Sequence, residues 1–344
     1  MSDAVRQETE ALLARFTALG ARRIEADILQ PAEVLLDLYG EDIRARAYVT
    51  QDQLRGEQML RPDFTVPVVQ MHMAEHAEPA RYTYAGPVFR RQEEDAGRPS
   101  EYPQVGYEVF DRGPADKVEA EIYAAFHAAL SGLPVRAIIG DMAILRAAVL
   151  ALDTTEHRKA ALLRHLWRPN RFRALLDRFS VPLELPESVI GGPEIGLRSA
   201  ADVAERLILR EADAQAPRLA PDDRAALEAL LDVKVSAGDA VETLRALGVP
   251  GTEAPIKALD ARLAAFEAAG IDLSAMQFEV SYGRTSMEYY DGFVFGFEVE
   301  GLPPVATGGR YDALTLVLGE GSHVPAVGGV VRPDLVAQLK GASC

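Results

Sequence analysis

The chain has 344 residues, 48% of them hydrophobic, which suits two or three packed domains and excludes a disordered protein. Acidic residues outnumber basic ones by 52 to 36, and the net charge of -16 disfavours a general attraction to nucleic acid. The one cysteine, Cys344, is the last residue, which excludes internal disulfides and zinc sites built on cysteine pairs. No signal-like or membrane-spanning apolar run occurs, so we expect a cytoplasmic protein without membrane contact.

The first 140 residues begin with a helix pattern and continue with strand patterns. The stretch "RQETEALLARFTALG" has helical spacing, and Gly20 at its end is a helix stop. Further along, "RYTYAGPVFRR" and "VGYEVFD" alternate with period two, so Tyr107 and Glu108 should face opposite sides of a strand. The segment between these two stretches is too polar to be a strand. We therefore predict a long antiparallel hairpin.

Residues 141–270 are rich in Ala, Leu, Arg and Glu and carry helix signals throughout. Asp239 and Glu242 have the spacing of a capping box at the start of one helix. The loop "GGPEIG" has glycines like those of a nucleotide-binding turn, but no strand pattern precedes it, so we expect no nucleotide site there. Four apolar residues with helical spacing predict a buried helix face: Ile256, Leu259, Leu263 and Phe266.

Strand patterns return from Met276 onward. In "YYDGFVFGFEVEG", Phe293, Phe295 and Phe297 alternate with small or polar residues, so one face of the strand is aromatic and the other nearly bare. A bare face suggests that either a ligand or another element of the chain approaches the backbone closely.

The order of these parts predicts the domain organisation. Because the helical part lies between two strand-rich parts, we expect residues 1–140 and 271–344 to form one core domain, with 141–270 as a helical insertion. The expected fold class is α+β, with an antiparallel sheet flanked by helices.

Four segments, in order, resemble the catalytic core of class II histidyl-tRNA synthetases. They are "LRPDFT" (60–65), "GPVFRRQ" to "QVGYEVF" (86–110), "YYDGFVF" (289–295) and "TGGRYDAL" (307–314), the last followed by "PAVGG" (325–329). The resemblance covers both strand-rich parts, and the family carries an insertion where this chain has its helical part. It implies a class II synthetase-like antiparallel sheet with helices around it, and a dimer.

The same resemblance implies a pocket for histidine, whose ammonium, carboxylate and imidazole call for acids, a polar group and aromatic walls. Asp63, Thr65 and Gln104 match ammonium contacts, although the family usually has glutamate where Asp63 stands, while Glu108 and two tyrosines match positions around the imidazole. Taken singly, each residue has a structural explanation, such as an ion pair or core packing. Their agreement over three separated segments favours a ligand. The predicted histidine-binding residues are Asp63, Thr65, Arg90, Gln104, Glu108, Tyr290 and Tyr311.

The nucleotide half of the resemblance is incomplete. Adenylation needs arginines that stabilise charge on the transferring phosphate, and losing one costs about 100-fold or more in rate. Arg90 matches the second-motif arginine, and the loop residue Arg98 matches another that reaches the outer phosphates and marks a residual nucleotide-site loop. Thr285 takes the place of the histidyl-specific arginine, with Arg284 one position away, a shift that a local bulge would correct. Leu335 takes the place of the third-motif arginine, with Arg332 three residues early. We therefore expect no catalytic residues.

Other common reaction centres are missing. The chain has no phosphate-binding P-loop, no "HExxH" zinc helix and no "GxSxG" nucleophile turn. His72 and His76 have helical spacing but no evident third ligand, so we expect neither a metal nor a cofactor. The family's C-terminal anticodon-binding domain is also missing, and with the acidic charge this leads us to expect no tRNA partner.

A family that combines these features is that of the ATP phosphoribosyltransferase regulatory subunits, which are histidyl-tRNA synthetase-like and which this chain resembles. The resemblance implies that the chain has no catalysis of its own and acts in the first step of L-histidine biosynthesis. It further implies a hetero-octamer with a short-form catalytic subunit, self-association as a dimer, and L-histidine as feedback effector.

Two other functions remain open on the residues alone. The chain could be an enzyme that activates histidine or another amino acid, because Arg90 and Arg98 are retained. It could also be a structural scaffold whose amino-acid site is vestigial.

Overall fold

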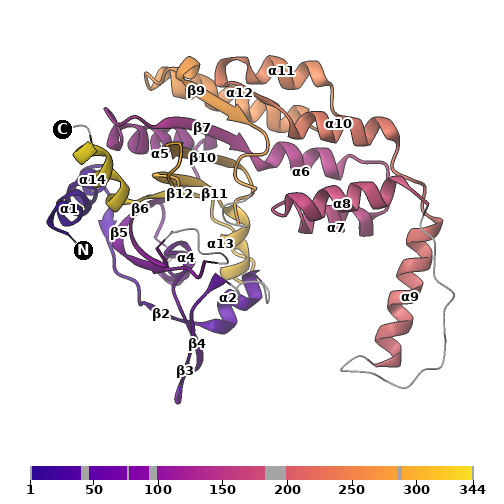
Figure 1. The fold of residues 1–344 in the computed structure, drawn as a ribbon, viewed down its shortest axis with the longest axis horizontal. Coiled ribbons are helices and arrows are strands. Elements are labelled where there is room, and N and C mark those ends of the chain that lie inside the picture. Colours follow the sequence, from indigo (N-terminus) through magenta and orange to yellow (C-terminus); the bar gives the residue numbers. More distant parts are fainter. Residues whose placement is uncertain are drawn as a thin grey trace.

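The computed structural model describes residues 2–39, 46–75, 77–92, 99–182, 199–284 and 289–342. A nine-stranded sheet lies at its centre, with the strand order β1-β5-β6-β12-β11-β10-β7-β9-β8 (Figure 1). Its strands are β1 (Arg22–Arg23), β5 (Ala80–Phe89), β6 (Glu101–Phe110), β7 (Arg136–Asp141), β8 (Lys234–Ser236), β9 (Met276–Glu279), β10 (Phe293–Glu298), β11 (Ala306–Arg310) and β12 (Ala326–Val331).

Strand pairing confirms the predicted antiparallel sheet over its centre and adds parallel pairs near both edges. β5 and β6 form the predicted hairpin, with Ala80 opposite Phe110 at one end and Phe89 opposite Glu101 at the other. Every neighbouring pair from β5 across to β7 is antiparallel. β1 pairs parallel with β5, and β7 pairs parallel with β9. The predicted α+β class is therefore confirmed, with a sheet that is mixed at its edges.

Three helices cover one face of the sheet: α1 (Asp3–Ala18), α5 (Ala115–Ala129) and α12 (Glu253–Ala268). The aromatic face of β10 packs against them. The ring of Phe295 lies 5.2 Å from that of Phe126 on α5, and the ring of Phe293 lies 5.8 Å from that of Phe266 on α12. Removing such large apolar side chains from water is the main favourable term in folding, so this layer is the core of the protein.

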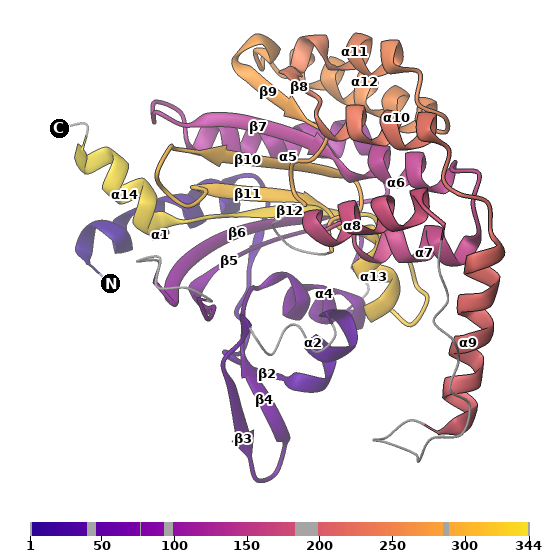
Figure 2. The same ribbon diagram turned by 45° about the vertical axis from the view of Figure 1, so that its right-hand side comes forward.

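The opposite face of the sheet carries a second group of elements. They are α2 (Ala32–Tyr39), α4 (Thr65–Glu75), α13 (Asp312–Leu318) and a three-stranded sheet, β2-β4-β3, made of β2 (Leu29–Pro31), β3 (Val49–Asp52) and β4 (Gly56–Leu60). The β3–β4 hairpin projects away from the main sheet (Figure 2). The last helix, α14 (Pro333–Ala342), lies beside α1, where Lys340 Nζ contacts Glu8 Oε2 at 2.7 Å.

The segment between β7 and β9 is mostly helical and extends beyond one end of the sheet (Figure 1). Its elements are α6 (Met142–Leu150), α7 (Glu156–Arg164), α8 (Pro169–Ser180), α9 (Ala200–Gln215), α10 (Pro221–Leu231), the strand β8, α11 (Ala240–Leu247) and α12, with 3-10 turns at Ala237–Asp239 and Leu273–Ala275. The "GGPEIG" loop lies outside the described residues. No helix in the described part of the chain has the length and apolar character needed to cross a membrane.

Two helix predictions are confirmed and one is wrong. α1 ends before Gly20, whose φ is 90°, and the four apolar residues predicted to share a face are buried on α12. Asp239 does not form a capping box, since it has helical backbone angles and its side chain makes no capping bond. A 3-10 turn leads into α11 instead. Ser236 caps that turn, and its Oγ accepts a hydrogen bond from the Gly238 amide at 3.3 Å.

A buried ion network joins α12 to the sheet and to α5. Arg262 of α12 contacts Glu119 on α5, and it contacts Asp141 at the end of β7 at 2.8 Å. Glu119 also accepts a hydrogen bond from Arg310 of β11 at 2.5 Å. The side chains of Arg262, Glu119 and Asp141 are each at most 5% exposed. Because these charges are out of water, each carboxylate depends on its arginine partner.

We predict that replacing Arg262 by methionine lowers the free energy of unfolding by about 3–5 kcal/mol, because Glu119 and Asp141 stay buried without their shared cation. Urea unfolding of both proteins measures the change. Arg245→Met is the control, since Arg245 on α11 is an exposed residue that contacts Asp260 at 3.2 Å. Equal, small effects of the two substitutions would show that the network does not stabilise the fold.

Candidate functional site

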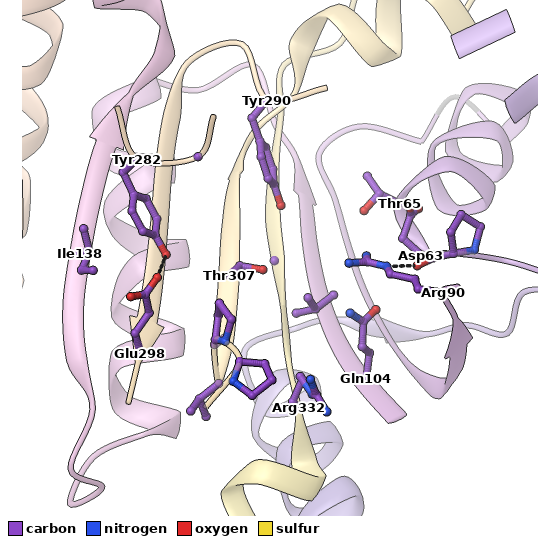
Figure 3. Close-up of a pocket in the computed structure, with 18 of the residues that line it drawn as sticks. Asp63, Thr65, Arg90, Gln104, Ile138, Tyr282, Tyr290, Glu298, Thr307 and Arg332 are labelled. Carbon is purple, nitrogen blue, oxygen red and sulfur yellow. Dashed lines mark hydrogen bonds between the residues drawn. The ribbon is translucent and has the colours of Figure 1, made fainter. Parts of the chain in front are cut away.

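A cavity of about 830 Å³ lies on the face of the sheet opposite α5 and α12. Its volume falls in the range of roughly 300–1,000 Å³ that is typical of small-molecule sites. The structure brings all the predicted histidine-binding residues into its wall: Asp63, Thr65, Arg90, Gln104, Glu108, Tyr290 and Tyr311. Figure 3 shows Asp63, Thr65, Arg90 and Gln104 together on one side, which we call the acceptor end, and Tyr282 with Glu298 on the other, which we call the far end.

Two glycines of the sheet leave room for larger side chains that line the cavity. Glu108 of β6 lies over Gly328 of β12, where a Cβ atom would come within 1.6 Å of Glu108 Oε2. Tyr282 lies over Gly296 of β10, where a Cβ atom would come within 1.7 Å of the tyrosine Oη. The nearly bare face of β10 is thus covered by Tyr282, a residue from another part of the chain. Of the two explanations that the sequence left open, close approach of another element therefore applies at Gly296.

Glu108 is the centre of the acceptor end. Its side chain is buried, and its two oxygens accept hydrogen bonds from two phenols: Tyr84 Oη at 2.7 Å and Tyr311 Oη at 2.6 Å. Burial raises the pKa of Glu108 to about 7, while the hydrogen bonds from Tyr311 and Tyr84 oppose the rise. With this pKa the carboxyl group is half ionised near pH 7 and mostly ionised above it. The carboxylate still has lone pairs that can accept hydrogen bonds from a ligand.

Two further oxygens at the acceptor end lack donors. Asp63 Oδ2 and Gln104 Oε1 are buried and have no hydrogen-bond partner within the described residues. The other oxygen of Asp63 accepts from the Val66 amide in the first turn of α4 at 3.4 Å, which fixes the carboxylate. Burial raises the pKa of Asp63, and the charge of Arg90 opposes this rise. Buried acceptors without donors are costly, so this end of the cavity favours a ligand that supplies N–H groups.

The remaining predicted residues frame this end. Arg90 lies just after β5, and its Nε donates to the Pro62 carbonyl at 2.8 Å. Thr65 opens α4 and accepts a hydrogen bond from Tyr289 Oη at 3.1 Å. Tyr290 is buried, and Figure 3 shows its ring pointing down into the cavity between the two ends. Together these side chains make a polar pocket with aromatic walls.

The arginines assigned to the nucleotide half lie in different places. Arg98 and Thr285 are outside the described residues. Arg284 is not part of the cavity wall. Its Nε donates to the Leu166 carbonyl between α7 and α8 at 2.7 Å, and its guanidinium lies over the ring of Phe172 on α8. Arg284 therefore reaches into the helical segment and away from the acceptor end.

Arg332 lines the cavity, which its sequence position did not indicate. Its guanidinium lies 4.1 Å above the centre of the Tyr102 ring, and it contacts Asp334 at 2.7 Å. The side chain is held by an aromatic ring and a carboxylate at once. The sequence did contain an indication of this position, because Arg332 directly follows the strand β12. A residue directly after a strand can still face the surface of the sheet.

The far end of the cavity combines cations with acids. Tyr282 Oη donates to Glu298 at 3.0 Å, as Figure 3 shows, and Glu298 contacts Arg136 at 3.4 Å. Lys234 contacts Glu279 at 3.0 Å. Each of these cations already has a carboxylate partner, which offsets its attraction for an anionic ligand.

The histidine pair singled out in the sequence serves the core. His72 is buried in α4, stacks on Phe110 with 3.8 Å between ring centroids and shares a hydrogen bond with Tyr82 Oη at 3.0 Å. His76 lies outside the described residues. Over the part of the chain that the structure describes, no group of three His, Cys, Asp or Glu side chains is placed to hold a metal ion.

Sequence comparison relates the chain to two groups of proteins. The histidyl-tRNA synthetase family model matches residues 2–190 and 194–336. Relatives from Mesorhizobium japonicum, Brucella anthropi and Rhizobium rhizogenes, each named an ATP phosphoribosyltransferase regulatory subunit, are 33%, 31% and 30% identical. The matches span 95%, 93% and 96% of this chain and 96%, 94% and 97% of those proteins.

Solved structures share the fold. A Bacillus halodurans protein described as an ATP phosphoribosyltransferase regulatory subunit/histidyl-tRNA synthetase superposes with a TM-score of 0.73 at 22% identity, over 98% of this chain and 79% of that one. The histidyl-tRNA synthetase of Nostoc sp. PCC 7120 gives 0.67 at 17% identity, over 98% and 72%. The class II synthetase-like fold is therefore confirmed. The chain belongs to the histidyl-tRNA synthetase family and, within it, to the ATP phosphoribosyltransferase regulatory subunits.

Proposed function

We propose that this chain is a non-catalytic subunit that works in the cytoplasm with a short-form ATP phosphoribosyltransferase catalytic subunit, in the first step of L-histidine biosynthesis. It is needed for the activity of that partner and carries feedback inhibition by L-histidine. The observation that supports this proposal best is the acceptor end of the cavity, where Asp63, Gln104 and Glu108 are all buried and all line the wall. Histidine supplies both an ammonium group and a ring N–H to such oxygens.

The proposed binding mode uses each of the groups described above. The ammonium donates to Asp63 Oδ2 and Gln104 Oε1, which have no other donor within the described residues. The imidazole N–H donates to Glu108 and lies beside Tyr290 and Tyr311. The carboxylate of the ligand lies toward Arg90, whose positive charge also acts on Asp63. Every buried acceptor of this end is then satisfied.

The far end of the cavity supports a role without catalysis by this chain. Adenylation depends on cations that are free to stabilise charge on the transferring phosphate. Here Arg136 and Lys234 contact Glu298 and Glu279, and Arg332 contacts Asp334. Arg284, the cation closest in sequence to the histidyl-specific arginine, lies against the helical segment instead.

Feedback inhibition requires that histidine prefer one state of the complex. The proposed complex is a hetero-octamer in which this chain forms dimers and no tRNA takes part. Residues 281–283 line the cavity, and the next residue, Arg284, contacts Leu166 and Phe172 of the helical segment. A ligand that contacts this stretch can therefore influence the helical segment. A coupling free energy of about 1–3 kcal/mol corresponds to about a 5- to 150-fold change in affinity between the two states.

One observation favours a second candidate, a chain that activates histidine or another amino acid. Arg90 and Arg332 both line the cavity, so two cations of the chain can contact a ligand there. Histidine-dependent exchange of pyrophosphate into ATP tests this activity directly. Exchange by the purified chain would replace the regulatory proposal by an enzymatic one.

The regulatory proposal is tested by mixing this chain with a short-form catalytic subunit and measuring product from ATP and phosphoribosyl diphosphate. We expect little product from the catalytic subunit alone, more from the mixture, and inhibition of the mixture by histidine. If the catalytic subunit is equally active alone, or if histidine has no effect on the mixture, the proposal is wrong.

We predict that Glu108→Gln weakens histidine binding by about 10- to 150-fold, because a hydrogen bond to a charged acceptor contributes about 1.5–3 kcal/mol. Assembly with the catalytic subunit should be unchanged. Calorimetry with histidine and size-exclusion chromatography of the mixture measure the two effects. Glu298→Gln, at the far end of the same cavity, is the matched control and should bind histidine like the unchanged chain. Inhibition that survives Glu108→Gln would place the effector site elsewhere.

We predict that Asp63→Asn weakens binding of histidine and leaves binding of imidazolepropionate unchanged. Imidazolepropionate has the ring and the carboxylate of histidine but no ammonium group, so it cannot use the charge of Asp63. Calorimetric titration of both proteins with both ligands gives the four affinities of a double cycle. Equal losses for the two ligands would show that Asp63 supports the shape of the pocket and does not bind the ammonium.

A further inference from the structure

We propose that Tyr84 is a positioning residue of the histidine site, whose hydroxyl holds the Glu108 carboxylate in its charged form and in one orientation. Tyr84 thereby sets the pH range in which the effector is bound. This inference rests on the proposed function, because it concerns the same ligand site. Tyr84 is not part of the cavity wall, and it acts on the ligand only through Glu108.

The hydrogen bonds of Glu108 identify the residue. Tyr84 Oη donates to Oε1 at 2.7 Å, and Tyr311 Oη donates to Oε2 at 2.6 Å. Tyr311 also lines the cavity, so a ligand ring can contact it directly. Tyr84 lies behind the carboxylate, on the neighbouring strand β5. Its effect on binding must therefore pass through the charge and orientation of Glu108.

The ring of Tyr84 is held in place on several sides. It lies over Gly106 of β6, where a Cβ atom would come within 2.0 Å of the ring. It stacks on Phe64 with 4.3 Å between centroids and an interplanar angle of 16°. The guanidinium of Arg61 lies over the Phe64 ring at 3.9 Å, and Arg61 Nε donates to the Pro87 carbonyl at 2.9 Å. This stack leaves the Tyr84 hydroxyl little freedom to turn away from Glu108.

Among the groups around Glu108, the two phenols that donate hydrogen bonds to it do most to stabilise its charged form. Asp63, between β4 and α4, repels its charge, and Thr65, the first residue of α4, favours it. Tyr290, before β10, and Tyr311, after β11, also face it. From β12 the neighbour is Gly328, which carries no charge. Arg90 acts chiefly on Asp63.

The charged form of Glu108 is the one that binds a ring N–H, since a protonated carboxyl loses acceptor capacity. Burial raises the pKa of Glu108 to about 7, so the free site changes from weak to strong binding as the pH rises through neutrality. A hydrogen bond to a charged group contributes about 1.5–3 kcal/mol, which equals about one to two pH units. Without the Tyr84 hydroxyl, this transition should move upward by about that amount.

The test compares Tyr84→Phe with Tyr82→Phe. Both tyrosines are buried on β5, but the Tyr82 hydroxyl bonds to His72 and not to Glu108. The ligand is triazolylalanine, a histidine analogue whose ring keeps an N–H and gains no proton between pH 6 and 9. Relative to the unchanged chain, Tyr84→Phe should bind it about 5- to 50-fold more weakly at pH 7 and within about twofold at pH 9. Tyr82→Phe should show no such change with pH.

A second measurement separates this inference from the proposed function. Carboxyl carbon NMR of the ligand-free protein, labelled at glutamate, follows the titration of Glu108 without any ligand, with Glu108→Gln to assign the signal. If the unchanged chain does not bind histidine or triazolylalanine, the histidine site is wrong, and the NMR titration still tests Tyr84. If Tyr84→Phe leaves the Glu108 titration where it was, or lowers affinity equally at every pH, then Tyr84 only fills space and the inference is wrong.

Discussion

The buried carboxylate of Glu108 is the interaction on which the rest of the cavity depends. A charged group that is removed from water persists only if fixed dipoles replace its hydration. Two phenols supply them, and Gly328 supplies the space, because any larger residue on β12 would occupy the position of the carboxylate. The acceptor end therefore depends on the register of three paired strands, β5, β6 and β12, and on the position of the segment after β11.

The sheet separates the aromatic core from the cavity through the alternation of its side chains. On β10 the phenylalanines face α5 and α12 and build the core, while Gly296 on the other side gives room to Tyr282. On β6, Tyr107 stacks on Phe16 of α1, and its neighbour Glu108 faces the cavity. Substitutions in the cavity should thus leave the aromatic core intact, since the two sets of residues share backbone but not contacts.

Much of this arrangement could be predicted from the sequence. Period-two patterns gave the β5–β6 hairpin and the opposite faces of Tyr107 and Glu108, and the resemblance gave residues that the fold collects in one cavity. The partners of those residues could not be predicted. Strand alternation shows which side of a sheet Tyr84 faces but not that its hydroxyl reaches Glu108, which depends on strand register. The position of Arg332 depends likewise on how β12 ends beside Tyr102.

The same cavity explains how a synthetase-like fold can serve regulation. Recognition of an amino acid depends on buried acceptors, and these are held by the centre of the sheet, where register leaves little freedom. Stabilisation of a transferring phosphate depends on cations, and among the described residues Arg136 and Lys234 contact acids while Arg284 lies against α8. A few changes at the margin can therefore remove catalysis without disturbing the acceptor end. Arg284 adds a connection in return, because it ties the cavity segment at 281–283 to the helical segment, and the proposed feedback regulation would use this contact.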